Sequence, residues 1–132
     1  MMGKWHGWAL TAALVLCPAP SWAKPRSITV QTVVVEETGL FRPQQTNIES
    51  EEVCGRFRPS DAQVLAWLAK AKEVSAPAFY ETATITQCSA KGHLSTTSGK
   101  TYPWILDPGG GIIIETSARD AIYLKGPQLP LR

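Results

Sequence analysis

The cysteines are the residues whose chemistry can be argued most directly from type and spacing. The chain holds three of them, Cys17, Cys54 and Cys88, and no Cys-x-x-Cys motif. A redox-active or metal-binding pair is the rival interpretation, but zinc would need His93 and scattered carboxylates as further ligands. If Cys17 is removed with an N-terminal signal, the two remaining thiols pair in an oxidising compartment. We therefore predict a structural Cys54–Cys88 disulfide worth roughly 3.5–4 kcal/mol, with no metal site and no cofactor.

His93 is the only histidine beyond the N-terminal stretch and the one candidate for acid–base catalysis. Ser95, Ser98 and Ser117 lie in no Gly-x-Ser-x-Gly motif, which the nucleophile elbow of a hydrolase requires. The glycines at 109–111 are followed by isoleucines rather than by the Lys-Ser/Thr of a phosphate-binding loop, so they indicate a hairpin turn. We expect a surface histidine and no catalytic residue. A small hydrolase that uses His93 with a carboxylate is the alternative.

Basic residues around the middle of the chain are one candidate binding face. Arg56 and Arg58, together with Lys70, Lys72 and Lys100, could meet an anionic component of the cell surface. Acidic residues close in sequence offset these charges, which favours an ordinary solvated face.

Two aromatic residues are the other candidate. Tyr102 and Trp104 alternate along a predicted strand and therefore share one of its faces. They form a binding patch if that face is uncovered. They belong to the core if the predicted helix covers it, which the small size of the domain favours.

The first 23 residues have the layout of a secretory signal peptide. Lys4 precedes an apolar run from Trp8 to Cys17, prolines follow, and Ser21 and Ala23 supply the small residues that a signal peptidase requires. The run of about ten residues is shorter than the about twenty that a membrane-spanning helix needs. We predict cleavage after Ala23, export to the bacterial periplasm and no stable membrane insertion afterwards. A eukaryotic secreted protein, an uncleaved anchor and a lipoprotein acylated at Cys17 are the alternatives.

Length and composition limit the remaining chain to one small domain. Of the 132 residues 44% are hydrophobic, and 13 Lys and Arg oppose 11 Asp and Glu, which gives a formal net charge of +2. This balance excludes a disordered polyelectrolyte and a strongly basic binder of nucleic acid. Residues 24–132 are expected to form a single α+β domain with loose termini.

The clearest predicted element is a helix over residues 59–72. Ser60 and Gln63 make a capping box, and Asp61 and Lys70 complement the helix dipole at its two ends. The apolar residues share one arc that is wide enough to cover a sheet: Val64, Leu65, Trp67, Leu68 and Ala71. The helix must end before Pro77, which has no amide hydrogen to donate.

β-branched residues and alternation predict strands elsewhere. The expected strands are residues 27–35, 79–88, 92–97, 100–106, 112–115 and 121–125. Residues 36–45 are expected to be a loop, 48–53 are ambiguous, and 126–132 are expected to hang from the last strand as a tail. The resulting fold is α+β, with one amphipathic helix packed on a four- to five-stranded, mainly antiparallel sheet. The disulfide would tie Cys54, just before the helix, to Cys88 at the end of its strand.

Residues 54–115 resemble a group of small exported bacterial proteins of uncharacterised function. The shared pattern is a Cys (Cys54), Phe57-x-Pro59, a helix that begins with Gln-Val, a second Cys (Cys88) and a Trp-x-x-x-x-Gly hairpin that starts at Trp104. The resemblance implies export and a disulfide-tied α+β fold, and it carries no activity. Members often have further cysteines near the C-terminus, which this chain lacks, so no second disulfide is expected.

The patterns together favour a periplasmic module that binds or inhibits a protein partner in the cell envelope, as an immunity protein does, without catalysis. The hydrolase based on His93 and an accessory component of an envelope or conjugation apparatus are the alternatives. The candidate binding face comprises Tyr102, Trp104, Arg56 and Arg58, and no nucleic acid is expected as a partner.

Overall fold

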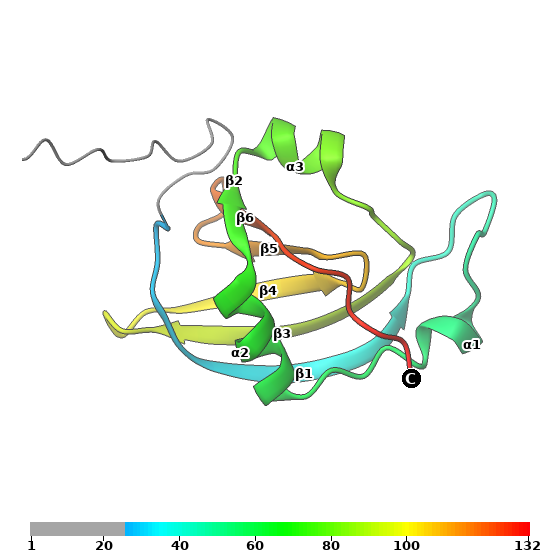
Figure 1. The fold of residues 1–132 in the computed structure, drawn as a ribbon, viewed down its shortest axis with the longest axis horizontal. Helices are drawn as coiled ribbons and strands as arrows, with labels where there is room; N and C mark the ends of the chain where they lie inside the picture. The colour runs from blue at the N-terminus through cyan, green and yellow to red at the C-terminus, as the bar shows by residue number, and fades with distance from the viewer. Residues whose placement is uncertain (1–25) are drawn as a thin grey trace, which may run out of the picture.

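The computed structural model describes residues 26–132 (Figure 1), and the predicted signal peptide lies outside the described residues. One antiparallel sheet of six strands forms the centre of the domain, in the order β1-β3-β4-β5-β6-β2. Its strands are β1 (Val30–Phe41), β2 (Lys72–Val74), β3 (Cys88–Thr96), β4 (Thr101–Asp107), β5 (Gly111–Glu115) and β6 (Ala121–Lys125). The helices are α1 (Glu51–Cys54), α2 (Asp61–Lys70) and α3 (Ala76–Thr82). The α+β class and the antiparallel pairing are therefore confirmed.

Helix α2 begins as the sequence predicts. The Ser60 side chain accepts the Gln63 amide at 3.1 Å, and the Gln63 side chain accepts the Ser60 amide at 2.8 Å, which completes the capping box. Three side chains of the helix are buried against the sheet: Val64, Trp67 and Leu68. Leu65, which the sequence placed on the same apolar arc, is 40% exposed.

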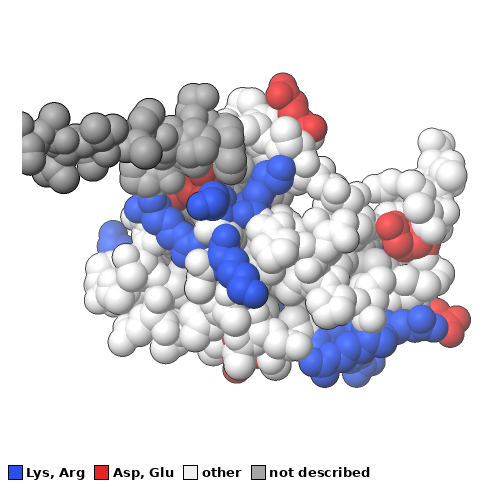
Figure 2. Space-filling model, viewed as in Figure 1, with Lys and Arg blue, Asp and Glu red and all other residues white. Residues whose placement is uncertain are grey.

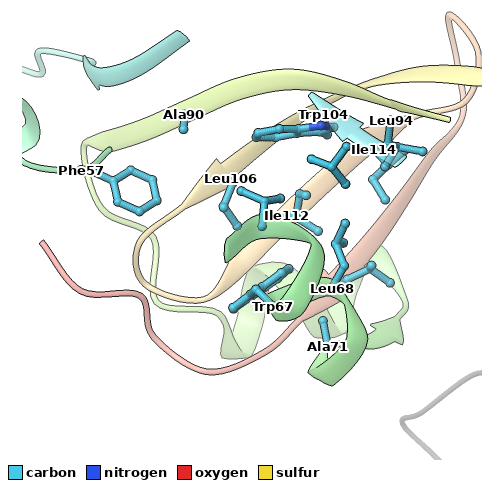
Figure 3. Close-up of a cluster of buried hydrophobic side chains, with 13 residues drawn as sticks. Phe57, Trp67, Leu68, Ala71, Ala90, Leu94, Trp104, Leu106, Ile112 and Ile114 are labelled. Atoms are coloured by element: carbon cyan, nitrogen blue, oxygen red, sulfur yellow. The ribbon is translucent and has the colours of Figure 1, made fainter. Parts of the chain in front are cut away.

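The core lies between α2 and the sheet face that it covers. Figure 3 shows Trp67 and Leu68 of α2, with Ala71 at its C-terminal cap, across from Leu106 and the other buried side chains of the central strands. Strand β1 adds Val33, and the strands β3 to β6 contribute residues at alternate positions: Ala90, Leu94, Trp104, Leu106, Ile112, Ile114 and Leu124. This alternation follows from the two-residue repeat of a β-strand, which sends neighbouring side chains to opposite faces.

The predicted strand over residues 79–88 is wrong, because the first part of it is helix α3. Ser75 caps this helix by accepting the Ala78 amide, and a proline occupies its first turn, where no amide donor is needed. Phe79 then packs on the sheet face opposite α2, where a Cβ at Gly111 would lie only 2.8 Å from its ring. Its ring centroid is 5.2 Å from that of Tyr123.

The single helix and the four to five strands of the prediction also need correction. The sheet gains β2, which follows α2 directly and pairs with β6. At the other edge β1 continues through residues 36–41, which were expected to be a loop, because these residues pair with β3 through register shifts.

The Cys54–Cys88 disulfide is confirmed. Its Cα atoms are 4.9 Å apart, and both cysteines are fully buried. Cys54 ends α1, and Cys88 begins β3 rather than ending a strand as predicted. The bridge therefore fastens the loop that leads into α2 to one end of the central sheet.

Residues 126–132, the C-terminal segment, do not hang free as predicted. They run from β6 toward α1 on the same side of the sheet as α2 (Figure 1). The Trp67 Nε1–H donates to the Pro127 carbonyl at 2.7 Å, and the Arg132 amide donates to the Arg56 carbonyl at 2.9 Å. Helix α2 and the C-terminal segment thus form one covering layer over the core.

Candidate binding site

The two aromatic residues of the predicted binding face do not form an exposed patch. Trp104 is 3% exposed and belongs to the core cluster, and Tyr102 is partly buried against the same cluster. The face of β4 that carries them is the one that α2 covers. Their role is therefore packing, and a surface for a partner must be sought elsewhere.

His93 lies on the opposite sheet face and is paired with a carboxylate. Its Nδ1 is 2.6 Å from Oε1 of Glu36 on β1, and the two side chains are 40% and 53% exposed. Within residues 26–132 the imidazole has no other hydrogen-bond partner, so no hydroxyl or thiol is bonded to it as a nucleophile would be. The pair holds β1 to β3 at the surface, where an ion pair contributes at most about 1 kcal/mol.

Arg56 and Arg58 lie in the loop between α1 and α2. The Arg58 Nε–H donates to the Gly55 carbonyl at 2.8 Å, and its outer N–H groups make no hydrogen bond within residues 26–132. The Arg56 carbonyl accepts a hydrogen bond from the Arg132 amide of the C-terminal segment. These two arginines therefore meet a part of the chain that is remote in sequence.

A cleft of about 230 Å³ lies where α2 and the C-terminal segment face one another. One wall comes from the start and outer side of the helix, and the other comes from the proline-rich chain beyond β6. The lining residues are Phe57, Arg58, Pro59, Gln63, Ala66, Trp67, Lys70, Pro127, Gln128, Leu129, Pro130 and Arg132. Three of them are cations, and none carries a side-chain carboxylate.

Further cations surround this cleft. A neighbouring depression at the C-terminal end of α2 is lined by Lys70, Lys72 and Lys125. Figure 2 shows Lys and Arg side chains in two groups on this side of the molecule, one near each end of α2. We refer to six residues as the cationic face. Five of them line the two depressions, namely Arg58, Lys70, Lys72, Lys125 and Arg132, and the sixth is Arg56, whose carbonyl accepts the Arg132 amide.

The cationic face stands out because the described residues are neutral as a whole. Lys4 and Lys24 lie outside residues 26–132, so 11 of the 13 basic residues remain against 11 acidic ones. Within this range no Lys or Arg nitrogen lies within 4.0 Å of a carboxylate oxygen, so no cation of the face has an acidic partner. The cations of this face are therefore not neutralised by direct ion pairs.

Two of the four carboxylates that lie close to these cations in sequence accept hydrogen bonds within the domain, whereas the other two, Glu51 and Glu52 of α1, are exposed. Asp61 accepts the Val35 amide of β1 at 2.8 Å. Glu73 is 6% exposed and accepts both the amide and the hydroxyl of Ser27, at 2.9 and 2.7 Å. The expected neutralisation by acidic neighbours therefore does not occur at these two positions.

Part of the cationic face was accessible to sequence analysis and part was not. Arg56, Arg58, Lys70 and Lys72 were candidates because they lie close together along the chain. Arg132 and Lys125 were missed, because they come close to the other four cations only through the path of the chain after β6, which has no sequence signature. Lys100, the fifth residue of the proposed basic face, lies in the turn between β3 and β4 and lines neither depression.

Comparisons with known proteins give no information on function, so a functional argument rests on the residues described above. No protein-family model, curated protein or solved structure matches the chain. Within residues 26–132 no three His, Cys, Asp or Glu side chains are grouped as metal ligands would be. No helix in the same range has the length and hydropathy needed to cross a membrane.

Proposed function

We propose that this protein is an exported, non-enzymatic module that binds an acidic region of a protein partner through its cationic face. The observation that carries the proposal is the gathering of six cations around α2, without an acidic partner, on a domain whose described part is neutral. Unpaired charge of one sign raises the rate of encounter with an oppositely charged partner and favours one orientation of docking.

The oxidising compartment is part of the proposal. A buried disulfide persists in the periplasm or outside the cell and is rare in the cytosol, so the Cys54–Cys88 bridge is compatible with export. The partner is then a protein of the cell envelope. An inhibitor or immunity protein and an accessory component of an envelope apparatus are two forms of this role.

A hydrolase is the second candidate, and one observation favours it. His93 and Glu36 form the imidazole–carboxylate pair that a general base requires. The pair lacks a bonded nucleophile among the described residues and lines none of the clefts given above. His93→Ala therefore leaves the biological phenotype unchanged if the protein is a binder, and abolishes it if the protein is a hydrolase.

A charge-reversal experiment tests the binding proposal. The probe is the blocked peptide hexaglutamate, titrated into isotope-labelled protein at low salt and followed by NMR. Arg56→Glu, Arg58→Glu and Lys70→Glu are combined in one variant. Because each exposed ion pair is worth about 0.2–1 kcal/mol, we expect the affinity to fall about ten-fold or more.

The matched control reverses the same number of charges elsewhere: Lys91→Glu, Lys100→Glu and Arg119→Glu. This variant has the same net charge but leaves the cationic face intact, so we expect it to keep most of the affinity. An equal loss in both variants would show that net charge alone attracts the peptide, and the proposal would then be wrong.

A further inference from the structure

Two hydrogen bonds fix the shape of the cleft between α2 and the C-terminal segment. Its two walls are held together by the hydrogen bond from Trp67 Nε1 to the Pro127 carbonyl at one point and by the bond from the Arg132 amide to the Arg56 carbonyl at another. Walls fixed in this way form a site before a ligand arrives, which lowers the ordering cost of binding.

The polar groups of the cleft are mainly hydrogen-bond donors. The side-chain oxygen of Gln63 is occupied by the Ser60 amide, which leaves the NH₂ group of Gln63 available. Arg58 uses Nε internally and keeps its outer N–H groups, and the Lys70 ammonium carries only donors. A ligand for this site must therefore supply acceptors, and carboxylates match both the charge and the geometry of the donors.

Apart from Gln128, the remainder of the lining is largely apolar. Phe57, Pro59, Ala66, Leu129 and the two prolines of the C-terminal segment form the floor and walls. A volume of about 230 Å³ is smaller than the 300–1,000 Å³ typical of sites that enclose a drug-sized ligand or cofactor. It suits one apolar side chain, such as leucine, that projects from a longer segment.

We infer that the cleft receives an apolar side chain of an extended acidic segment in the protein partner, whose flanking carboxylates pair with Arg58, Lys70 and Arg132. The inference rests on the proposed function and specifies which element of the partner is recognised. The apolar side chain gives specificity, and the charges around it set the orientation of the segment.

The test compares two blocked pentapeptides, Glu-Asp-Leu-Asp-Glu and Glu-Asp-Ser-Asp-Glu, by NMR titration of the full exported chain. Burying most of a leucine side chain corresponds to an affinity gain of roughly ten-fold or more. We expect the leucine peptide to bind about ten-fold more tightly than the serine peptide, with the largest shifts at Ala66, Trp67 and Leu129.

Two variants of α2 distinguish the contribution of the cleft to peptide binding from the contribution of the surrounding charges. Ala66→Trp fills the cleft and changes no charge, so we expect it to abolish the preference for leucine and to leave the serine peptide unaffected. Ala69→Trp adds the same side chain at another exposed alanine of the helix that does not line the cleft, and it should keep the preference. Thermal melting curves show whether either variant has lost its fold.

The possible failures are distinguishable. If both peptides bind equally to the wild type and both respond to reversal of Arg56, Arg58 and Lys70, the proposed function stands and the cleft inference is wrong. If neither peptide binds at low-millimolar concentration, the proposed function is wrong as well. If a heparin tetrasaccharide binds more tightly than either peptide, the face belongs to a polysaccharide and the inference is overturned.

Discussion

Removal of the Cys54–Cys88 disulfide should lower the free energy of unfolding by about 4 kcal/mol. The two cysteines are 34 residues apart in sequence, and the chain-entropy model gives about 3.8 kcal/mol for a loop of this length at 25 °C. Both cysteines are fully buried, so replacing them with alanine also removes two packed sulfur atoms from the interior. The loss is a large part of the about 5–15 kcal/mol that stabilises a typical domain.

Urea unfolding followed by tryptophan fluorescence measures this loss in the variant Cys54→Ala/Cys88→Ala. With a slope of about 1.2 kcal/mol per molar urea for a domain of this size, the midpoint should fall by about 3 M. The control is a reducing agent, which should weaken the wild type by a comparable amount and leave the double variant unchanged. The slope should be slightly larger in the variant, because the unfolded chain exposes more surface without the crosslink.

Two outcomes would refute this reasoning. A double variant that unfolds within about 1 kcal/mol of the wild type would show that the crosslink does not limit the unfolded chain as assumed. Free thiols at both positions in protein isolated from an oxidising compartment would show that the bridge does not form there. In the second case the proposal of export would lose its structural support.

Two further predictions concern single side chains. Ser60→Ala leaves the Gln63 backbone amide at the start of α2 without its acceptor, and it should cost about 1 kcal/mol in urea unfolding, with little change in the core. Burial raises the pKa of Asp107 above 3.8, although hydrogen bonds from Gly109 and Thr86 oppose this effect. The folded state therefore holds the proton more tightly than the unfolded state, and the stability contributed by this group falls as the pH rises from 3.8 through the folded pKa. In Asp107→Asn this dependence is absent, so the stability advantage of the wild type over the variant should be larger below pH 3.8 than at neutral pH; an advantage that shrinks on acidification would contradict the sign.

The elements that sequence analysis predicted well are those with strong local signals. The capping box at Ser60 and Gln63 indicated the start of α2, and the alternation of Tyr102, Trp104 and Leu106 placed β4 within one residue of Thr101–Asp107. Residues 79–88 failed because their threonines favour a strand, while Ser75 and the following proline favour a helix start. Strand propensity depends on context and gave way to the local capping interaction.

Non-local pairing explains the other differences. Residues 36–41 look like a loop because they are polar and contain a glycine, yet they extend β1 along an irregular edge of the sheet. Gly39 adopts a φ of 63° there, a conformation that glycine reaches without strain, and this accompanies one of the register shifts. No local pattern reveals such a bulged strand, since its partner β3 lies about fifty residues further along the chain.

The position of the cleft follows from the amount of sheet that must be covered. Six strands at a spacing of about 4.8 Å make a sheet about 24 Å wide. A helix of 10 residues is about 15 Å long and about 10 Å across, so α2 alone leaves part of the core open. The C-terminal segment, with Leu129 packed against the core, covers the remainder. The cleft lies at the boundary between α2 and the C-terminal segment. Because both elements must pack on the core, the cations that they carry are brought close to one another.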